Sequence, residues 1–288
     1  MKKTILFTLL LGASVVAVAD QSTEVNSSLY PSPVVSIYNT TWSPETVAQG
    51  VNVVHSAFAG IDGTSIGEVI GGPALDTEYS SWSKVQVSGA TNILAFGGQT
   101  TVFSPDMNNV EGVAQAIVEY ATKYNFDGID FDLENVKGAA ANSQLLKIIP
   151  AIRNIDPSLI IMAAPQAYNG LSWASTSGVD TIVPLLKDGA CGTKDCLDAV
   201  FVQNYNNSNQ NNVQYGWDQV VTAISQANNP NLTTKFIIGF EQTVNPSDIV
   251  KPSSTSKYLT NFAGLGLWPT SQAEDTATEQ VMVKVMGL

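Results

Sequence analysis

Histidine and cysteine, the side chains that most often bind zinc, are nearly absent from this chain. Its 288 residues include one histidine, His55, and two cysteines, Cys191 and Cys196. A structural zinc site needs four ligands, and these three residues cannot supply them, so we expect no metal and no other cofactor. His55 lies inside an apolar segment, which is more typical of a core residue than of a catalyst.

Basic side chains are also scarce. The chain has 13 Lys and Arg against 25 Asp and Glu, a net charge of −12. Removal of an N-terminal leader that holds Lys2 and Lys3 changes this to −14. Such a charge repels the phosphates of nucleic acid and anionic membrane surfaces, and it argues against both as partners. A neutral polysaccharide is compatible with it.

Long hydrophobic runs are missing after the first residues. Lys2 and Lys3 precede an apolar stretch over residues 4–16, and Ala17-Val18-Ala19 has the small-residue pattern of a signal-peptidase site. We therefore expect residues 1–19 to be a signal peptide and residues 20–288 to be a secreted protein, extracellular or periplasmic. An uncleaved anchor is the alternative. In an exported protein, the pair Cys191 and Cys196 indicates a disulfide that closes a short loop; two buried free thiols are the other interpretation.

Short β-branched runs alternate with amphipathic stretches along the whole mature chain. The predicted strands span residues 33–38, 51–58, 92–97, 126–133, 159–163, 199–205, 235–240 and 262–268. The clearest predicted helices span residues 110–124, 143–155, 217–227 and 273–286. Eight strands that alternate with helices predict right-handed crossovers and an α/β fold, a (β/α)8 TIM barrel in one domain. An open doubly wound sheet is the alternative, but no glycine-rich turn follows the first strand.

The most informative segment is the acidic strand at residues 126–134, Phe-Asp-Gly-Ile-Asp-Phe-Asp-Leu-Glu. Side chains alternate between the two faces of a strand, so Asp130, Asp132 and Glu134 share one face and three large apolar residues share the other. In a barrel the apolar set faces the helices, and the carboxyls line the interior toward the C-terminal mouth, where such enzymes place their chemistry. Asp127 is out of phase with the other three and is predicted to be a structural turn residue.

Carboxyls this close together cannot all ionise in a partly dry site, so at least one pKa should rise. A carboxylic acid that stays protonated near neutral pH can protonate a glycosidic oxygen, and Glu134, nearest the mouth, is the best candidate. A calcium or magnesium site or a solvated edge strand are the alternatives. A hard cation also prefers carbonyl ligands in a loop, and the interleaved apolar residues argue against a solvated edge.

This segment resembles the DGxDxDxE motif of glycoside hydrolase family 18, the chitinases and endo-β-N-acetylglucosaminidases, and the chain looks like a bacterial chitinase. Four further segments resemble motifs of the same family. They are Ala95-Phe-Gly-Gly98 (SxGG), Met162-Ala-Ala-Pro-Gln166 (MAPQ), Gln203-Asn-Tyr-Asn206 (QxYN) and the closing strand up to Trp268. The resemblance covers nearly the whole mature chain.

The resemblance implies a substrate-assisted, retaining mechanism, an exception to the usual two-carboxylate scheme. Glu134 would protonate the leaving oxygen, and the N-acetyl carbonyl of the substrate would attack the anomeric carbon. Asp132 would orient the acetamido N–H, with Asp130 as a buried support, and Tyr205 would donate its hydroxyl to the acetamido oxygen. Each is therefore a predicted catalytic residue.

The resemblance also implies three substrate-binding residues, Gln166, Asn206 and Trp268, whose indole would stack on the sugar. Each has a structural alternative. Gln166 and Tyr205 could fill the barrel, Asn206 could simply begin a loop, and Trp268 could be core. Three more tryptophans lie near predicted strand-to-helix loops and could be further sugar platforms: Trp42, Trp82 and Trp173.

Two positions depart from the family. The SxGG serine is Ala95 here, and the tyrosine that the first strand often carries aligns with Ile37, which would leave Tyr38 facing away from the site. Both missing hydroxyls would have supported Asp130. The insertion subdomain that deepens the cleft in many members is also absent, since few residues separate the last two strands. We expect an open cleft, which favours endo attack.

The sequence thus predicts an exported, monomeric, endo-acting chitinase whose partners are chitin or N-acetylglucosamine oligosaccharides. Two alternatives remain. One is an endo-β-N-acetylglucosaminidase that cuts the chitobiose core of N-glycans with the same catalytic strand. Only the loops would distinguish this enzyme from a chitinase. The other is a catalytically inactive chitin-binding lectin on the same barrel, although such proteins usually lose the terminal glutamate, and Glu134 is present.

Overall fold

The structure is a computed structural model of the 288-residue chain. It describes residues 31–40, 46–69, 86–173, 181–241, 245–253, 257–269 and 272–288. The predicted signal peptide, Trp42 and Trp82 lie outside these ranges. None of the helices in this described part is both long and apolar enough to cross a membrane.

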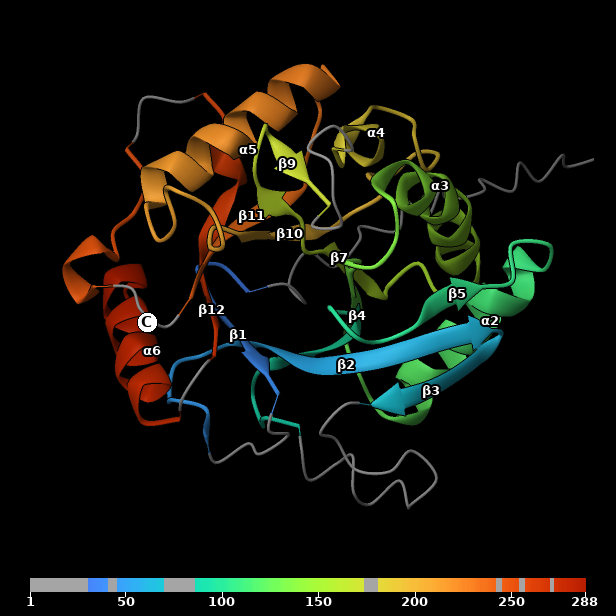
Figure 1. Ribbon diagram of the computed structural model, residues 1–288, viewed down its shortest axis with the longest axis horizontal. Helices are drawn as coiled ribbons and strands as arrows, with labels where there is room; N and C mark the ends of the chain where they lie inside the picture. The colour runs from blue at the N-terminus through green and yellow to red at the C-terminus, as the bar shows by residue number, and fades with distance from the viewer. Residues whose placement is uncertain are drawn as a thin grey trace, which may run out of the picture.

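Eight parallel strands close into a barrel (Figure 1). In barrel order they are β1 (Val34–Asn39), β2 (Val53–Gly63), β4 (Thr91–Gly97), β6 (Gly128–Asp132), β7 (Ile160–Ala163), β10 (Ala199–Gln203), β11 (Lys235–Glu241) and β12 (Phe262–Trp268). The ring is complete because β12 pairs with β1 and β10 pairs with β11. The predicted (β/α)8 barrel is therefore confirmed, and the open doubly wound sheet is excluded.

In the described part of the chain, helices cover the outside of the barrel after β4, β6, β7, β10 and β12 (Figure 1). They are α2 (Val110–Lys123), α3 (Gly138–Ile155), α4 (Val183–Leu186), α5 (Val213–Ala227) and α6 (Gln272–Met286). Two of them begin at an asparagine cap: Asn109 accepts from the Gly112 N–H at 3.1 Å, and Asn212 accepts from the Tyr215 N–H at 3.0 Å. Such caps satisfy N–H groups that the first helical turn leaves without partners. The Asn212 cap explains why α5 begins four residues before the predicted start, because that prediction was based on the apolar stripe alone.

The barrel has two apolar layers. The larger lies between strands and helices, and the smaller fills the interior. Phe201 is the largest apolar side chain of β10 in the interior, and two glycines make space for its ring. A Cβ atom at Gly239 or Gly266 would lie 2.4 or 2.3 Å from that ring. Glycine is thus required at both positions, because a Cβ contact this close is a steric clash.

Short elements extend the barrel at its mouth. β2 continues past the predicted end and pairs with β3 (Ser65–Val69) and β5 (Phe103–Pro105), which together form the arm on the right of Figure 1. After β7, the chain forms the small hairpin of β8 (Gln166–Ala167) and β9 (Leu171–Ser172). Only residues 242–261 connect β11 to β12, and their described part holds two short 3-10 helices, η2 (Pro246–Asp248) and η3 (Leu259–Asn261). The predicted absence of an insertion subdomain is confirmed.

Cys191 and Cys196 are joined by a disulfide, with an S–S distance of 2.10 Å. The bond closes the loop between α4 and β10, near the N-terminal end of the barrel strands.

Candidate active site

Strand β6 carries the acidic residues into the barrel. Ile129 and Phe131 pack in the outer apolar layer, so Asp130 and Asp132 point the other way, into the interior. Both aspartates are buried, with 0% and 2% of their surface exposed. Glu134 follows two residues after the strand ends and is half-buried. The alternation that the sequence predicts is what the structure has, and it aligns the three carboxyls toward the mouth.

Asp127 does not belong to this row. It is exposed, at the opposite end of β6, and its carboxylate accepts a hydrogen bond from the Asn92 N–H at 2.8 Å. Its backbone carbonyl accepts from the Ile160 N–H at 3.1 Å. Asp127 thus ties β6 to its two neighbours, as expected of a structural residue.

Two side chains converge on one oxygen of Asp130. The Tyr38 hydroxyl donates to Oδ2 at 2.5 Å, and His55 Nδ1 lies 3.1 Å from the same atom. The expected orientation of Tyr38 is therefore wrong. Ile37 packs in the outer layer, and Tyr38 faces the interior. Because side chains alternate along a strand, an alignment shifted by one residue reverses both assignments.

The hydroxyl missing at Ala95 is a real departure. Ala95 pairs with Asp130 across β4 and β6 and is fully buried in the interior layer, where its methyl group donates nothing. The hydrogen bonds to Asp130 therefore come from β1 and β2 instead of β4.

Gln203 holds Asp132. Its Nε2 donates to Asp132 Oδ1 at 2.7 Å and to the Ala164 carbonyl at 2.8 Å. Burial raises the pKa of Asp132 well above its usual value, and the charges of Glu134 and Asp130 raise it further, while the Gln203 hydrogen bond lowers it. Gln203 is not among the site residues predicted from the sequence. The signal was available, because Gln203 lies two residues before Tyr205 and so shares its face of the strand.

Glu134 and Tyr205 both favour their protonated forms. Burial raises the pKa of Glu134. Burial also raises the pKa of Tyr205 well above 10, and the nearby charges of Asp132 and Glu134 add to the effect. Tyr205 therefore keeps its hydroxyl hydrogen as a donor, and Glu134 is an acid that holds its proton to a higher pH than an ordinary glutamate.

The predicted binding residues differ in position. Trp268 ends β12 half-buried, with its ring stacked on Phe58 at 5.8 Å and tilted against Tyr38 at 5.4 Å. Gln166 is half-buried and pairs with Gln203 between β8 and β10, which puts it beside the acidic row. Asn206 is exposed and in the left-handed region, with φ of 59°, so it begins the loop after β10.

Trp173 is a core residue and not a sugar platform. Its side chain is buried in the outer layer, and its Nε1 donates to Asn142 Oδ1 at 3.0 Å.

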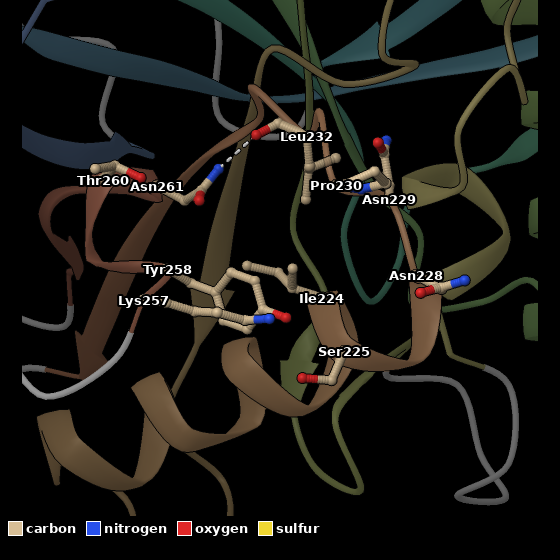
Figure 2. A pocket seen from close by; sticks show the side chains of 10 residues that line it. All are labelled: Ile224, Ser225, Asn228, Asn229, Pro230, Leu232, Lys257, Tyr258, Thr260 and Asn261. Atoms are coloured by element: carbon tan, nitrogen blue, oxygen red, sulfur yellow. Dashed lines mark hydrogen bonds between the residues drawn. The ribbon is translucent and has the colours of Figure 1, made fainter.

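A pocket of about 330 Å³ at the other end of the barrel does not compete for the role of active site (Figure 2). The end of α5 and the segments that lead into β11 and β12 line it. Two of its polar side chains already hydrogen-bond to the backbone: Asn261 donates to the carbonyls of Leu232 and Thr234, and the Ser225 hydroxyl donates to the Val221 carbonyl. Among the described residues, no three histidine, cysteine or acidic side chains are placed to hold a metal ion.

Comparison with known proteins gives consistent results. The family model for glycosyl hydrolases family 18 matches residues 34–284. Endochitinase 4 of Metarhizium robertsii is 30% identical over 149 residues, a match that spans 44% of this chain and 42% of that relative. A family 18 chitinase structure from Pseudoalteromonas aurantia has a TM-score of 0.62 at 19% identity and covers 88% of this chain and 100% of its own.

The same fold also occurs in a protein with a different title. The xylanase and α-amylase inhibitor protein from Scadoxus multiflorus has a TM-score of 0.60 at 18% identity, over 89% of this chain and 99% of its own. The fold alone therefore does not decide the activity, which depends on the residues of the site.

Proposed function

Since the chain belongs to glycosyl hydrolase family 18, we propose that it is an exported bacterial chitinase that hydrolyses β-1,4 bonds within chains of N-acetylglucosamine. The observation that carries the proposal is the intact row of Asp130, Asp132 and Glu134 in the barrel interior, with a raised pKa for both Asp132 and Glu134. A row of this kind costs free energy unless its carboxyls share protons, and catalysis at a glycosidic oxygen uses one of those protons.

In the proposed mechanism, Glu134 donates its proton to the leaving oxygen. The substrate's own acetamido oxygen attacks the anomeric carbon and forms an oxazolinium ring, so the protein supplies no nucleophile. Asp132 accepts a hydrogen bond from the acetamido N–H and stabilises the positive charge that develops there. Tyr205 donates its hydroxyl to the acetamido oxygen. Glu134, now ionised, then takes a proton from the water that opens the ring, and the anomeric configuration is retained.

Hydrogen bonds from Gln203 and Tyr38 hold the two aspartate side chains in fixed orientations. Gln203 fixes the Asp132 carboxylate at 2.7 Å, and Tyr38 fixes Asp130 at 2.5 Å. A catalytic group that is already oriented needs no reorganisation in the transition state, which is where preorganised hydrogen bonds are most effective. We propose that Trp268 forms the floor of the sugar site, with Gln166 and Asn206 as further polar contacts.

The substrate is tested by parallel hydrolysis of N-acetylglucosamine oligomers and of a high-mannose glycoprotein. We expect cleavage of the oligomers. Cleavage of the glycoprotein alone would favour the endo-β-N-acetylglucosaminidase alternative, and binding to chitin with no cleavage of either would favour the lectin alternative.

The endo mode rests on the short connection between β11 and β12, which leaves the cleft without an insertion subdomain. We expect a rapid fall in the viscosity of a long soluble chitin derivative. Release of mostly dimers from the first turnover, with little fall in viscosity, would contradict it.

Export is tested by the mass of the protein from the culture fluid, which should correspond to a chain that begins at Asp20. Size-exclusion chromatography tests the expected monomer.

A further inference from the structure

His55 is the only histidine of the chain, and it lies directly beside the acidic row. Its side chain is fully buried on β2, inside the barrel. The imidazole ring is held on two sides: it stacks on Tyr38 at 4.5 Å and meets the edge of Phe201 at 5.7 Å. A ring with this packing cannot turn away from Asp130 without displacing both neighbours.

The contact with Asp130 determines which ring nitrogen carries hydrogen. Asp130 Oδ2 accepts from the Tyr38 hydroxyl at 2.5 Å and lies 3.1 Å from His55 Nδ1. Because Oδ2 already acts as an acceptor for the Tyr38 hydroxyl, a hydrogen bond from the imidazole to the same oxygen requires hydrogen on Nδ1. Within the described part of the chain, His55 Nε2 is buried without a hydrogen-bond partner. A buried N–H without an acceptor is rarer than a buried acceptor without a donor, which favours hydrogen on Nδ1 and not on Nε2.

We propose that His55 is a positioning residue, which holds the Asp130 carboxylate in place through its Nδ1–H and so fixes the arrangement of Asp132 above it. The position that pairs with Asp130 on β4 is Ala95, whose methyl group donates no hydrogen bond. His55 supplies from β2 the second donor that β4 lacks. The inference rests on the proposed function for its kinetic test, but its spectroscopic test does not depend on any activity.

The spectroscopic test is the ¹⁵N NMR signal of the imidazole, which is free of overlap because His55 is the only histidine. We expect hydrogen on Nδ1 in the wild-type protein, and a change of this pattern in Asp130→Ala, where the acceptor is gone. Hydrogen on Nε2 alone in the wild type, unchanged in Asp130→Ala, would overturn the proposal. This readout decides even where a variant at position 55 fails to fold.

The kinetic test compares three substitutions of His55. Asparagine places an amide N–H at the position of Nδ1, glutamine places one at the position of Nε2, and leucine has neither. We expect His55→Leu and His55→Gln to lower kcat roughly 10- to 100-fold, the range for a lost hydrogen bond to a charged group, and His55→Asn to keep most of it. KM should change little, because His55 is buried below Asp130 and does not reach the mouth.

A second-site rescue separates positioning from packing. Ala95→Ser puts a hydroxyl beside Asp130 on β4 and should restore part of the kcat of His55→Leu. Equal losses of kcat in all three variants, with no recovery by Ala95→Ser, would mean that His55 is only a core residue. Failure of the wild type to cleave N-acetylglucosamine oligomers would instead contradict the proposed function. The role of His55 would then be decided by the NMR result alone.

Discussion

Glu279 on α6 should make the protein less stable as the pH rises through the acid range. Its side chain is buried, and burial raises its pKa from 4.5 to about 7, although its carboxylate accepts a hydrogen bond from the Ala48 N–H at 2.6 Å. Asp275, one turn earlier and also buried, raises the pKa further. Between pH 4.5 and about 7 the folded state keeps a proton that the unfolded state has released, so stability falls over this window.

The size of the effect follows from the two pKa values. At about 1.4 kcal/mol for each pKa unit, the difference between 4.5 and about 7 gives a penalty at pH 8 of about 3.5 kcal/mol as an upper limit. Glu279→Gln removes the titration and keeps a carbonyl oxygen that can accept from Ala48. We expect this variant to equal the wild type at pH 4 and to be about 2 kcal/mol more stable at pH 8, as measured by urea unfolding at both pH values.

Glu119→Gln is the matched control, because Glu119 is exposed on α2 and its loss changes the net charge by the same amount. The control should leave the difference between pH 4 and pH 8 unchanged. An equal change of stability at both pH values, or a lower stability of Glu279→Gln at pH 8, would mean that burial does not raise the pKa of Glu279.

Three further changes probe the site and the fold. Gln203→Leu removes the hydrogen bond that lowers the pKa of Asp132. The acid limb of the kcat–pH profile should therefore move to higher pH, and kcat should fall roughly 10- to 100-fold. An acid limb at the same pH as in the wild type would contradict this. Trp268→Ala should raise KM for oligomers roughly tenfold through lost stacking, whereas unchanged KM with a lower Tm would make it a core residue. Cys191→Ser combined with Cys196→Ser should lower the free energy of unfolding by about 2 kcal/mol, as measured with urea. It should leave kcat unchanged, because the loop lies away from the mouth. A lower kcat with an unchanged free energy of unfolding would argue against this.

The acidic strand could be predicted because its pattern is unambiguous. Ile129 and Phe131 alternate with Asp130 and Asp132, and only one register puts the apolar pair under the helices. The same period-two argument placed Glu134 at the mouth. The barrel followed from the regular alternation of strands and helices, because parallel strands require such crossovers.

The first strand could not be placed in the same way. All six residues of β1 are buried, so the segment has no polar side that marks a solvent face, and sequence alone does not distinguish Tyr38 from Ile37 as the inward residue. The structure resolves this because Tyr38 pairs with His55 across β1 and β2. Trp173 was similarly ambiguous, since its partner Asn142 lies 31 positions earlier in the chain.

For His55 and Gln203, the sequence does not reveal which carboxylate each side chain contacts. Each acts through a carboxylate that is distant in sequence: Asp130 is 75 positions from His55, and Asp132 is 71 positions from Gln203. Contacts of this kind form only when the barrel closes. The period of two along a strand gives the face of each side chain but not its partner.

The role of Glu134 is tested most directly by the hydrolysis of a defined N-acetylglucosamine oligomer, followed by ¹H NMR from the first minutes. The wild type is compared with Glu134→Gln, and Glu119→Gln is the control. We expect the β-anomer to appear first, Glu119→Gln to match the wild type, and Glu134→Gln to lose roughly 10³-fold or more in kcat. An α-anomer as the first product, or activity that survives in Glu134→Gln, would contradict the central claim that Glu134 is the acid of a substrate-assisted, retaining hydrolase.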